Sequence, residues 1–171
     1  MQFASPQLHC KTLHMILQIT KNVGKKHVTK YIRDNGTETW MHSDNFFVVH
    51  DLCHFALEKT LGYTTAFCGM LNSGISIQDF EDRDTRNAMS ISKEAAYAEN
   101  MANLFLMETR QGNFDNIHAV IKDAHETVTK NYPAPVLSDA EVENIRTYLR
   151  ELLQQWTSLP EGNTMQLEFV F

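Results

Sequence analysis

A cluster of ionisable side chains lies within an otherwise apolar stretch, "VVHDLCHFALEKTLG", at residues 48–62. On a helix at about 100° per residue, His54 falls about 40° from His50, Glu58 about 80° and Asp51 about 100°. The opposite side of such a helix is almost wholly apolar, which indicates burial. A buried carboxylate or histidine is costly unless it is paired, and a metal ion is one efficient partner. Metal binding is therefore the first hypothesis for these four side chains.

Histidines four residues apart on a helix can bind one metal ion together. Their side chains point the same way, about 5–6 Å apart at Cβ, and His-x-x-x-His on a helix is half of a typical zinc site. The third ligand could be Glu58, one turn farther along, or a residue of another helix, of which Glu99 is the first choice. Less favoured contributors follow elsewhere in the chain: Glu94, Glu108, His118 and His125. We therefore expect a divalent metal with His50 and His54 as ligands, most readily zinc, although such ligands also suit iron, nickel and manganese.

The segment His50-Asp51-Leu52-Cys53-His54 resembles the His-Glu-x-x-His motif of zinc-dependent peptidases. In those enzymes the two histidines bind zinc and the glutamate is the general base for the metal-bound water. The resemblance implies that His50 and His54 are ligands and that Asp51 is the catalytic base. Aspartate is one methylene shorter than glutamate, so Asp51 would lie farther from the water. It could instead orient a histidine.

A second resemblance covers most of the chain. The stretches "VVHDLCHFALEKTLGYTTAFCGML", "AYAEN" and "W-x-x-LPEGNTMQLEF" resemble an uncharacterised bacterial family with a similar His-Asp-x-x-His-x-x-x-Glu helix and a Leu-Pro-x-Gly turn before its last strand. The chain departs from that pattern at Cys68, where a tryptophan is usual. The resemblance supports the choice of residues 48–62 as the functional segment and implies no activity.

The cluster could also be satisfied without a metal, either by a buried hydrogen-bond network or by a polar pocket that binds a ligand. HD-type phosphohydrolases use an adjacent His-Asp pair together with further His and Asp ligands on other helices. Four residues could supply such ligands here, although their order along the chain fits that family poorly: Asp115, His118, Asp123 and His125. Two hypotheses follow. One is a small metal-dependent hydrolase acting on an unidentified small molecule or peptide. The other is a non-enzymatic interaction or ligand-binding module in which the cluster is structural.

The composition excludes several classes of protein. The chain has 171 residues, of which 43% are apolar and 21% charged, with a net charge of −6. The basic surface that nucleic-acid binding needs is therefore not expected, and no apolar run is long enough for a membrane helix. Three cysteines without a CxxC pair and the lack of a signal peptide favour reduced thiols in a cytoplasmic protein. We expect one domain over residues 1–171, with residues 1–10 a flexible leader.

The elements that must position the cluster alternate between strand and helix patterns. Alternating residues from Leu13 predict a strand, and residues 27–42 predict a hairpin with a type I′ turn at Asn35-Gly36. Helices are expected over 45–61, 64–72, 90–110, 114–131 and 138–156, the first capped by Ser43 or Asp44 and ended by Gly62. "EDRDTRN" (81–87) is expected to be a polar connection, and "TMQLEFVF" a final strand. The sequence thus predicts an α+β fold: a small antiparallel sheet of the N-terminal strands and the C-terminal strand, packed with four to five helices.

Overall fold

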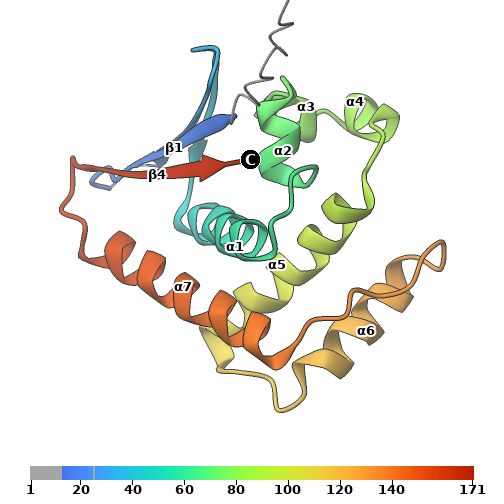
Figure 1. Cartoon of the computed structure of the whole chain (residues 1–171). Coiled ribbons are helices and arrows are strands. Elements are labelled where there is room, and N and C mark those ends of the chain that lie inside the picture. The colour runs from blue at the N-terminus through green and yellow to red at the C-terminus, as the bar shows by residue number, and fades with distance from the viewer. Residues whose placement is uncertain (1–12, 25) are drawn as a thin grey trace, which may run out of the picture.

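Four strands and seven helices make up the described part of the chain, residues 13–24 and 26–171 of a computed structural model (Figure 1). The predicted leader at residues 1–10 lies outside the described residues. The α+β class is confirmed. The elements are β1 (His14–Thr20), β2 (His27–Arg33), β3 (Glu38–Ser43), α1 (Asn45–Leu61), α2 (Phe67–Asn72), α3 (Ile77–Glu81), α4 (Arg83–Ala88), α5 (Lys93–Gln111), α6 (Ile117–Val128), α7 (Asp139–Ser158) and β4 (Thr164–Val170).

The strands form one antiparallel sheet in the order β3-β2-β1-β4, so the last strand joins the N-terminal strands as predicted. Alternation of side chains gives the sheet one buried face and one polar face. Met15, Leu17 and Ile19 of β1 are fully buried beneath it. On the polar face, cross-strand partners pair by hydrogen bonds, as in Gln18 Nε2 to Gln166 Oε1 at 2.9 Å. The apolar face is therefore available for helices.

The hairpin between β2 and β3 has a different turn from the one predicted. The Gly36 amide donates to the Arg33 carbonyl, and the Arg33 amide donates to the Thr37 carbonyl, each at 2.9 Å, which makes a three-residue loop of 34–36. Only Gly36 has a positive φ (80°); Asn35 does not. The prediction of a type I′ turn is therefore wrong. The Asn35 side chain instead accepts hydrogen bonds from the Thr37 amide and hydroxyl, at 3.0 and 2.7 Å, which stabilises the longer loop.

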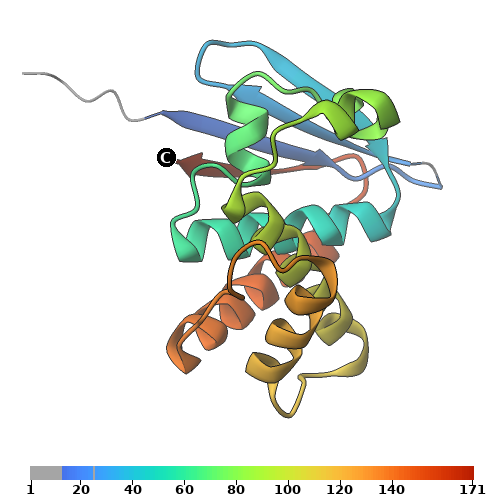
Figure 2. The ribbon, with the colours of Figure 1, turned by 90° about the vertical axis from the view of Figure 1, so that its right-hand side faces the viewer.

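Helix α1 lies at the centre of the fold, between the sheet on one side and helices α6 and α7 on the other (Figures 1 and 2). Its N-terminus is capped by Asp44, whose carboxylate accepts from the Phe46 and Phe47 amides at 2.9 and 3.2 Å. It ends at Gly62, which takes the left-handed conformation with φ 67°. Both boundaries agree with the sequence. Because α1 packs against α2, α5, α7 and three strands, most of its length is buried.

Helix α7 packs against α1 and holds it in position. The capping box predicted at its start is present, with Ser138 and Glu141 each bonding the other's amide. Near its end, the Trp156 indole N–H donates to Asn45 Oδ1 at 2.9 Å, which joins the end of α7 to the start of α1. The Lys21 ammonium, just after β1, donates to three carbonyls at the end of α7. Sheet, α1 and α7 are thus tied together at one end of the molecule.

Residues 81–87 are helical except for Asp82, which corrects the expectation of a polar connection. Glu81 ends α3, residues 83–87 belong to α4, and Asp82 lies between the two helices. Ser76 and Asp79 form a capping box at the start of α3, and the Asp82 carboxylate accepts from the Thr85 amide at 2.7 Å. Polar side chains of this stretch therefore accept hydrogen bonds from backbone amides at the start of a helix, instead of marking a solvated loop. Across the described residues, none of the helices is long and apolar enough to cross a membrane.

Candidate metal centre

Three of the predicted ligands meet between α1 and α5. His54 Nε2 lies 3.1 Å from Glu99 Oε2, and His50 Nε2 lies 3.9 Å from Glu99 Oε1. One ligand atom from each of the three residues lies within 4.8 Å of the other two. The edges of a tetrahedral zinc site with bonds near 2.0–2.1 Å are about 3.3 Å long. The three atoms therefore need to approach one another by at most about 1.5 Å to bind one ion.

Glu58 lies on the opposite side of the His54 ring from this group. Its Oε1 is 2.9 Å from His54 Nδ1, and its Oε2 accepts from the Cys68 amide at 2.8 Å. The side chain is fully buried. A carboxylate on Nδ1 holds the proton at that nitrogen and leaves Nε2 free to bind a metal. The structure thus places Glu58 behind a candidate ligand, whereas Glu99 lies among the candidate ligand atoms.

The Cys68 amide reaches Glu58 because α2 packs closely on the loop that precedes it. Gly69 makes this packing possible, since a Cβ at that position would lie 1.9 Å from the Thr64 carbonyl oxygen. The same loop is held by Glu94 of α5, whose carboxylate accepts from the Thr64 and Thr65 amides at 2.9 and 2.7 Å. Glu94 therefore supports the site from outside instead of contributing a ligand atom.

The charges at the site are strongly coupled. Burial disfavours the charged form of His54, but hydrogen bonds to Glu58 and Glu99 outweigh it and raise its pKa to about 10. The hydrogen bond to His54 lowers the pKa of Glu99 to about 2. Burial, together with the charge of His54, lowers the pKa of His50. Without a metal, His54 is therefore a cation held between two carboxylates and His50 is a neutral imidazole.

Asp51 lines the same cavity but is not among the convergent ligand atoms. It is 8% exposed, and burial raises its pKa to about 7 against the opposing effect of His54. The Asp51 carboxyl and the fully buried Tyr31 hydroxyl face each other, and this contact opposes the raised pKa of Asp51. Asp51 also raises the pKa of Tyr31, after burial itself. Asp51 is thus a carboxyl group whose pKa lies near 7, the range that suits a general base.

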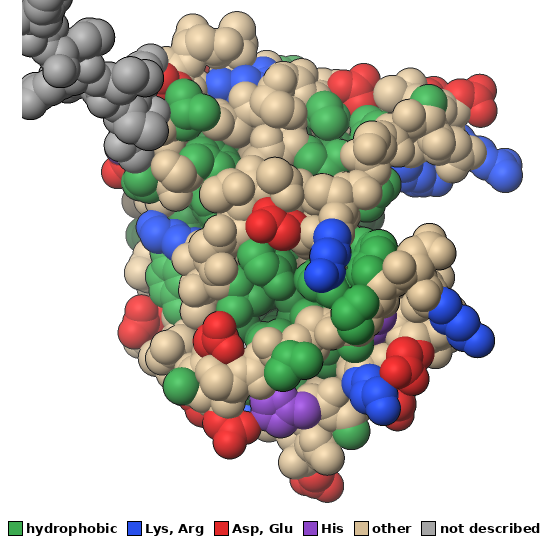
Figure 3. All heavy atoms as spheres, turned by 45° about the vertical axis from the view of Figure 1, so that its right-hand side comes forward, with side chains coloured by type: hydrophobic (Ala, Val, Ile, Leu, Met, Phe, Trp, Pro, Cys, Tyr) green, Lys and Arg blue, Asp and Glu red, His purple; other side chains and the backbone are tan. Residues whose placement is uncertain are grey.

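A cavity of about 730 Å³ opens beside the cluster. Figure 3 shows this face of the molecule hollowed, with hydrophobic side chains gathered around the hollow. Glu99 lies toward solvent, with 59% of its side chain exposed, whereas His54 is 3% exposed. The volume is within the usual range for small-molecule sites. Half of the lining residues are apolar: Met41, Phe47, Phe67, Met70, Ile77, Phe80, Ile91, Ala95, Ala96 and Val128.

The remaining predicted contributors lie elsewhere. Glu108 is buried in an ion pair with Arg146 (2.6 Å) between α5 and α7. His118 pairs with Asp139 at the surface, at 2.7 Å, and His125 contacts the Tyr132 carbonyl through Nε2 at 2.9 Å. No histidine of α6 belongs to the convergent group found among the described residues. The phosphohydrolase arrangement therefore has no support in the geometry.

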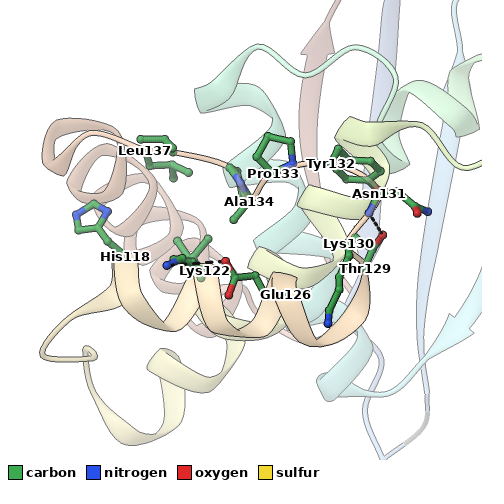
Figure 4. A pocket seen from close by; sticks show the side chains of 13 residues that line it. His118, Lys122, Glu126, Thr129, Lys130, Asn131, Tyr132, Pro133, Ala134 and Leu137 are labelled. Atoms are coloured by element: carbon green, nitrogen blue, oxygen red, sulfur yellow. Dashed lines mark hydrogen bonds and ion pairs between the residues drawn. The ribbon is translucent and has the colours of Figure 1, made fainter.

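A second cavity, of about 780 Å³, lies between α6 and the segment 129–137. Figure 4 shows His118, Lys122 and Glu126 along the helix, with Tyr132 and Leu137 on the segment that crosses it. It contains a single histidine and one carboxylate, Glu126, which pairs with Lys122 at 3.8 Å. This cavity therefore lacks the converging ligand atoms of the first one.

The thiols of the two buried cysteines are not part of the candidate ligand group. Cys53 and Cys68 are free thiols, as predicted. Burial raises the pKa of Cys53 to about 12 and that of Cys68 well above its ordinary value. Both are therefore protonated at neutral pH and behave as small apolar side chains.

Three contributors were missed by reasoning from the sequence. The Asn103 amide donates to Glu99 Oε1 at 2.9 Å and to the Glu99 carbonyl at 2.8 Å, which orients the carboxylate. The spacing of four residues between Glu99 and Asn103 was a signal for this contact. The Cys68 amide gave no such signal, because its contact with Glu58 depends on packing between separate segments. Nor did the sequence indicate Asn100, which lines the cavity and whose buried side-chain nitrogen has no hydrogen-bond partner among the described residues.

Comparisons of the chain with protein-family models, with curated proteins and with solved structures find no match. The resemblances to zinc-dependent peptidases and to the bacterial family therefore stay predictions, and the function must be argued from the geometry.

Proposed function

We propose that this chain is a metal-dependent hydrolase in which His50, His54 and Glu99 bind one divalent ion, most readily zinc. One observation carries the proposal: ligand atoms of these three residues, from two helices, lie within 4.8 Å of one another at the wall of a cavity. Two histidines and a carboxylate are a common ligand set of catalytic zinc. The proposal gives Glu58 the role of holding His54 in place.

The ion would replace a proton. Without metal, the proton on His54 Nε2 faces Glu99 Oε2 at 3.1 Å. A metal ion needs the lone pair of Nε2, so binding releases this proton while Glu58 keeps the proton on Nδ1. Glu58 and Glu99 together carry two negative charges, which match a divalent ion. The site is thus neutral when loaded, apart from Asp51.

A zinc ion held by these three residues would supply a water whose pKa is lowered to about 7. Asp51 is proposed as the base that would accept a proton at this site, because it lines the same cavity and burial raises its pKa to about 7. The apolar wall of the cavity would exclude bulk water and strengthen these electrostatic interactions.

A non-catalytic alternative has its own supporting observation. Both ring nitrogens of His54 already face carboxylates, at 2.9 and 3.1 Å, so a protonated His54 is fully satisfied without metal. The cluster would then join α1 to α5 and form part of the wall of a ligand-binding cavity. In that case the chain would be an interaction or binding module.

Metal content distinguishes the metal-dependent hydrolase from the non-catalytic module. We expect about one zinc ion per chain after dialysis, measured by plasma mass spectrometry on untagged protein. The double substitution His50→Ala/His54→Ala should remove it, because it removes both nitrogen ligands. His14→Ala/His118→Ala is the matched control, since both histidines lie in ion pairs at the surface. A wild-type protein that binds no ion, even after anaerobic purification and addition of metal, would leave the non-catalytic alternative.

A further inference from the structure

One buried polar atom at the cavity, the Asn100 side-chain nitrogen, has no hydrogen-bond partner among the described residues. Asn100 follows Glu99 directly in α5, so this donor lies next to the proposed ligand group along the chain. A buried donor without a partner destabilises the folded protein, and a ligand that accepts a hydrogen bond from it would offset this cost.

The charges around the cavity favour a neutral ligand. Apart from Glu99, four charged side chains line it from exposed positions, and the formal charges of these four cancel: Lys26, Arg86, Asp44 and Glu81. The two carboxylates nearest to His54 are those of Glu58 and Glu99. Together they balance the charge of a divalent ion, and without metal they exceed the single positive charge of a protonated His54. No unbalanced positive charge therefore remains for an anionic head group.

The rest of the wall is suited to an apolar body. Phe67, Phe80 and Ile91 come from three separate parts of the chain and line the cavity together with other apolar side chains. Burial of apolar ligand surface against these side chains would favour binding. The size of the cavity, its apolar lining and the unpaired donor of Asn100 thus point to the same kind of molecule.

We propose that this cavity binds an uncharged small molecule with an apolar body and a carbonyl head group, an amide or an ester. After a rotation that brings its buried nitrogen to the cavity surface, the Asn100 side chain would donate to the carbonyl oxygen and so position the carbonyl beside His50, His54 and Glu99. Asn100 is therefore a positioning residue. The inference deepens the proposed function by naming its substrate class. The claim that the bound molecule is hydrolysed rests on the proposed function, whereas the claim that it binds does not.

The test compares three compounds by ligand-observed NMR titration, with the full chain as purified and after treatment with a chelator. 4-Phenylbutanamide has the apolar body and the neutral head, acetamide has the head alone, and 4-phenylbutyrate has an anionic head. We expect 4-phenylbutanamide to bind at least tenfold more tightly than acetamide in both preparations. In the chelator-treated protein it should also bind at least tenfold more tightly than 4-phenylbutyrate.

Two variants locate the binding. Asn100→Asp replaces the donor with an acceptor and should weaken binding of 4-phenylbutanamide at least fivefold. Ala96→Phe adds a ring at the cavity wall and should abolish it. Asn113→Asp and Ala119→Phe make the same changes at exposed positions and should leave binding unchanged. Because Asn100→Asp keeps the size of the side chain, it tests the proposal even if Ala96→Phe does not fold.

The outcomes separate this inference from the proposed function, since metal content is measured in the same samples. Amide binding without any bound metal would support the cavity ligand and contradict the hydrolase. Bound metal without amide binding would support the hydrolase and contradict the cavity ligand. The inference is overturned if 4-phenylbutanamide binds no more tightly than acetamide, or if Asn100→Asp binds it as tightly as the wild type does.

Discussion

Replacement of Glu58 by glutamine is the most informative single substitution in the cluster. Glu58 is fully buried and joins two groups: His54 Nδ1 at 2.9 Å and the Cys68 amide at 2.8 Å. Glutamine has the same size, so the change leaves no cavity and adds no bulk. It removes the charge and replaces one acceptor oxygen with a donor nitrogen.

The structure fixes how glutamine would be oriented. The Cys68 amide can only donate, so the glutamine oxygen must face it. The glutamine nitrogen then faces His54 Nδ1, which must give up its proton to accept a hydrogen bond. The proton of a neutral His54 therefore moves to Nε2, the atom that the proposal assigns to the metal.

The expected losses follow from these contacts. In the metal-free protein, a charge-assisted hydrogen bond is lost, which should lower the free energy of unfolding by about 1.5–3 kcal/mol. Metal affinity should fall by about 10- to 100-fold, as for other residues that orient a ligand. Urea unfolding in the presence of a chelator measures the first, and competition with a chromophoric chelator measures the second. Long-range ¹H–¹⁵N NMR spectra report which nitrogen of His54 carries the proton.

Glu126→Gln provides the control. Glu126 is 56% exposed and lies 3.8 Å from Lys122, one turn away on α6. Its replacement should change stability by less than about 0.5 kcal/mol and leave the metal affinity as it was. If Glu58→Gln binds zinc as tightly as the wild type and His54 keeps its proton on Nδ1, the reasoning about Glu58 is refuted.

Four further substitutions or conditions test the same contacts. Asp51→Asn should lower the rate of hydrolysis of 4-nitrophenyl butyrate by about 10²- to 10⁴-fold at unchanged zinc content; equal rates would exclude Asp51 as the base. Gly69→Ala should cost about 1–3 kcal/mol in urea unfolding, since the new Cβ would lie 1.9 Å from a backbone carbonyl oxygen, and a neutral result would contradict the close packing of α2. Arg146→Met should cost about 3–5 kcal/mol because Glu108, 7% exposed, loses its partner; the added substitution Glu108→Gln should restore most of that loss, and no recovery would argue against the ion pair as the cause. In the metal-free protein, the free energy of unfolding should fall as pH rises from 6.5 through about 10, because folded His54 keeps its proton up to about pH 10 and the unfolded chain releases it near 6.5. His54→Asn should flatten that slope in urea unfolding at several pH values, and an unchanged slope would refute the coupling of His54 to the two carboxylates.

The part of the site that lies on one helix could be predicted from the sequence, because helical spacing fixes which side chains share a face. His50, His54 and Glu58 were placed together on this basis, and the caps of α1 were read from single residues. The same reasoning could not decide which nitrogen of His54 each carboxylate contacts. That choice depends on the Cys68 amide, which α2 brings to Glu58.

Contacts between elements were harder to predict. Glu99 was one of three carboxylates considered on α5, and only the packing of α5 on α1 distinguishes it from Glu94 and Glu108. The cavity and the unpaired nitrogen of Asn100 depend on several separate segments, so no local pattern indicates them. The stretch 81–87 was assigned to a loop because it is polar, whereas its Asp82 side chain caps a helix. Polarity alone does not distinguish a solvated loop from a short, capped helix.

The location of a bound ion tests the central claim most directly. Crystals of the zinc-loaded protein, measured on both sides of the zinc absorption edge, give an anomalous difference map that shows zinc alone. We expect one peak per chain, about 2.0–2.2 Å from His50, His54 and Glu99, with His54 Nδ1 still bonded to Glu58. A map without a peak at this position, or with zinc only at surface histidines such as His14 or His118, would contradict the account.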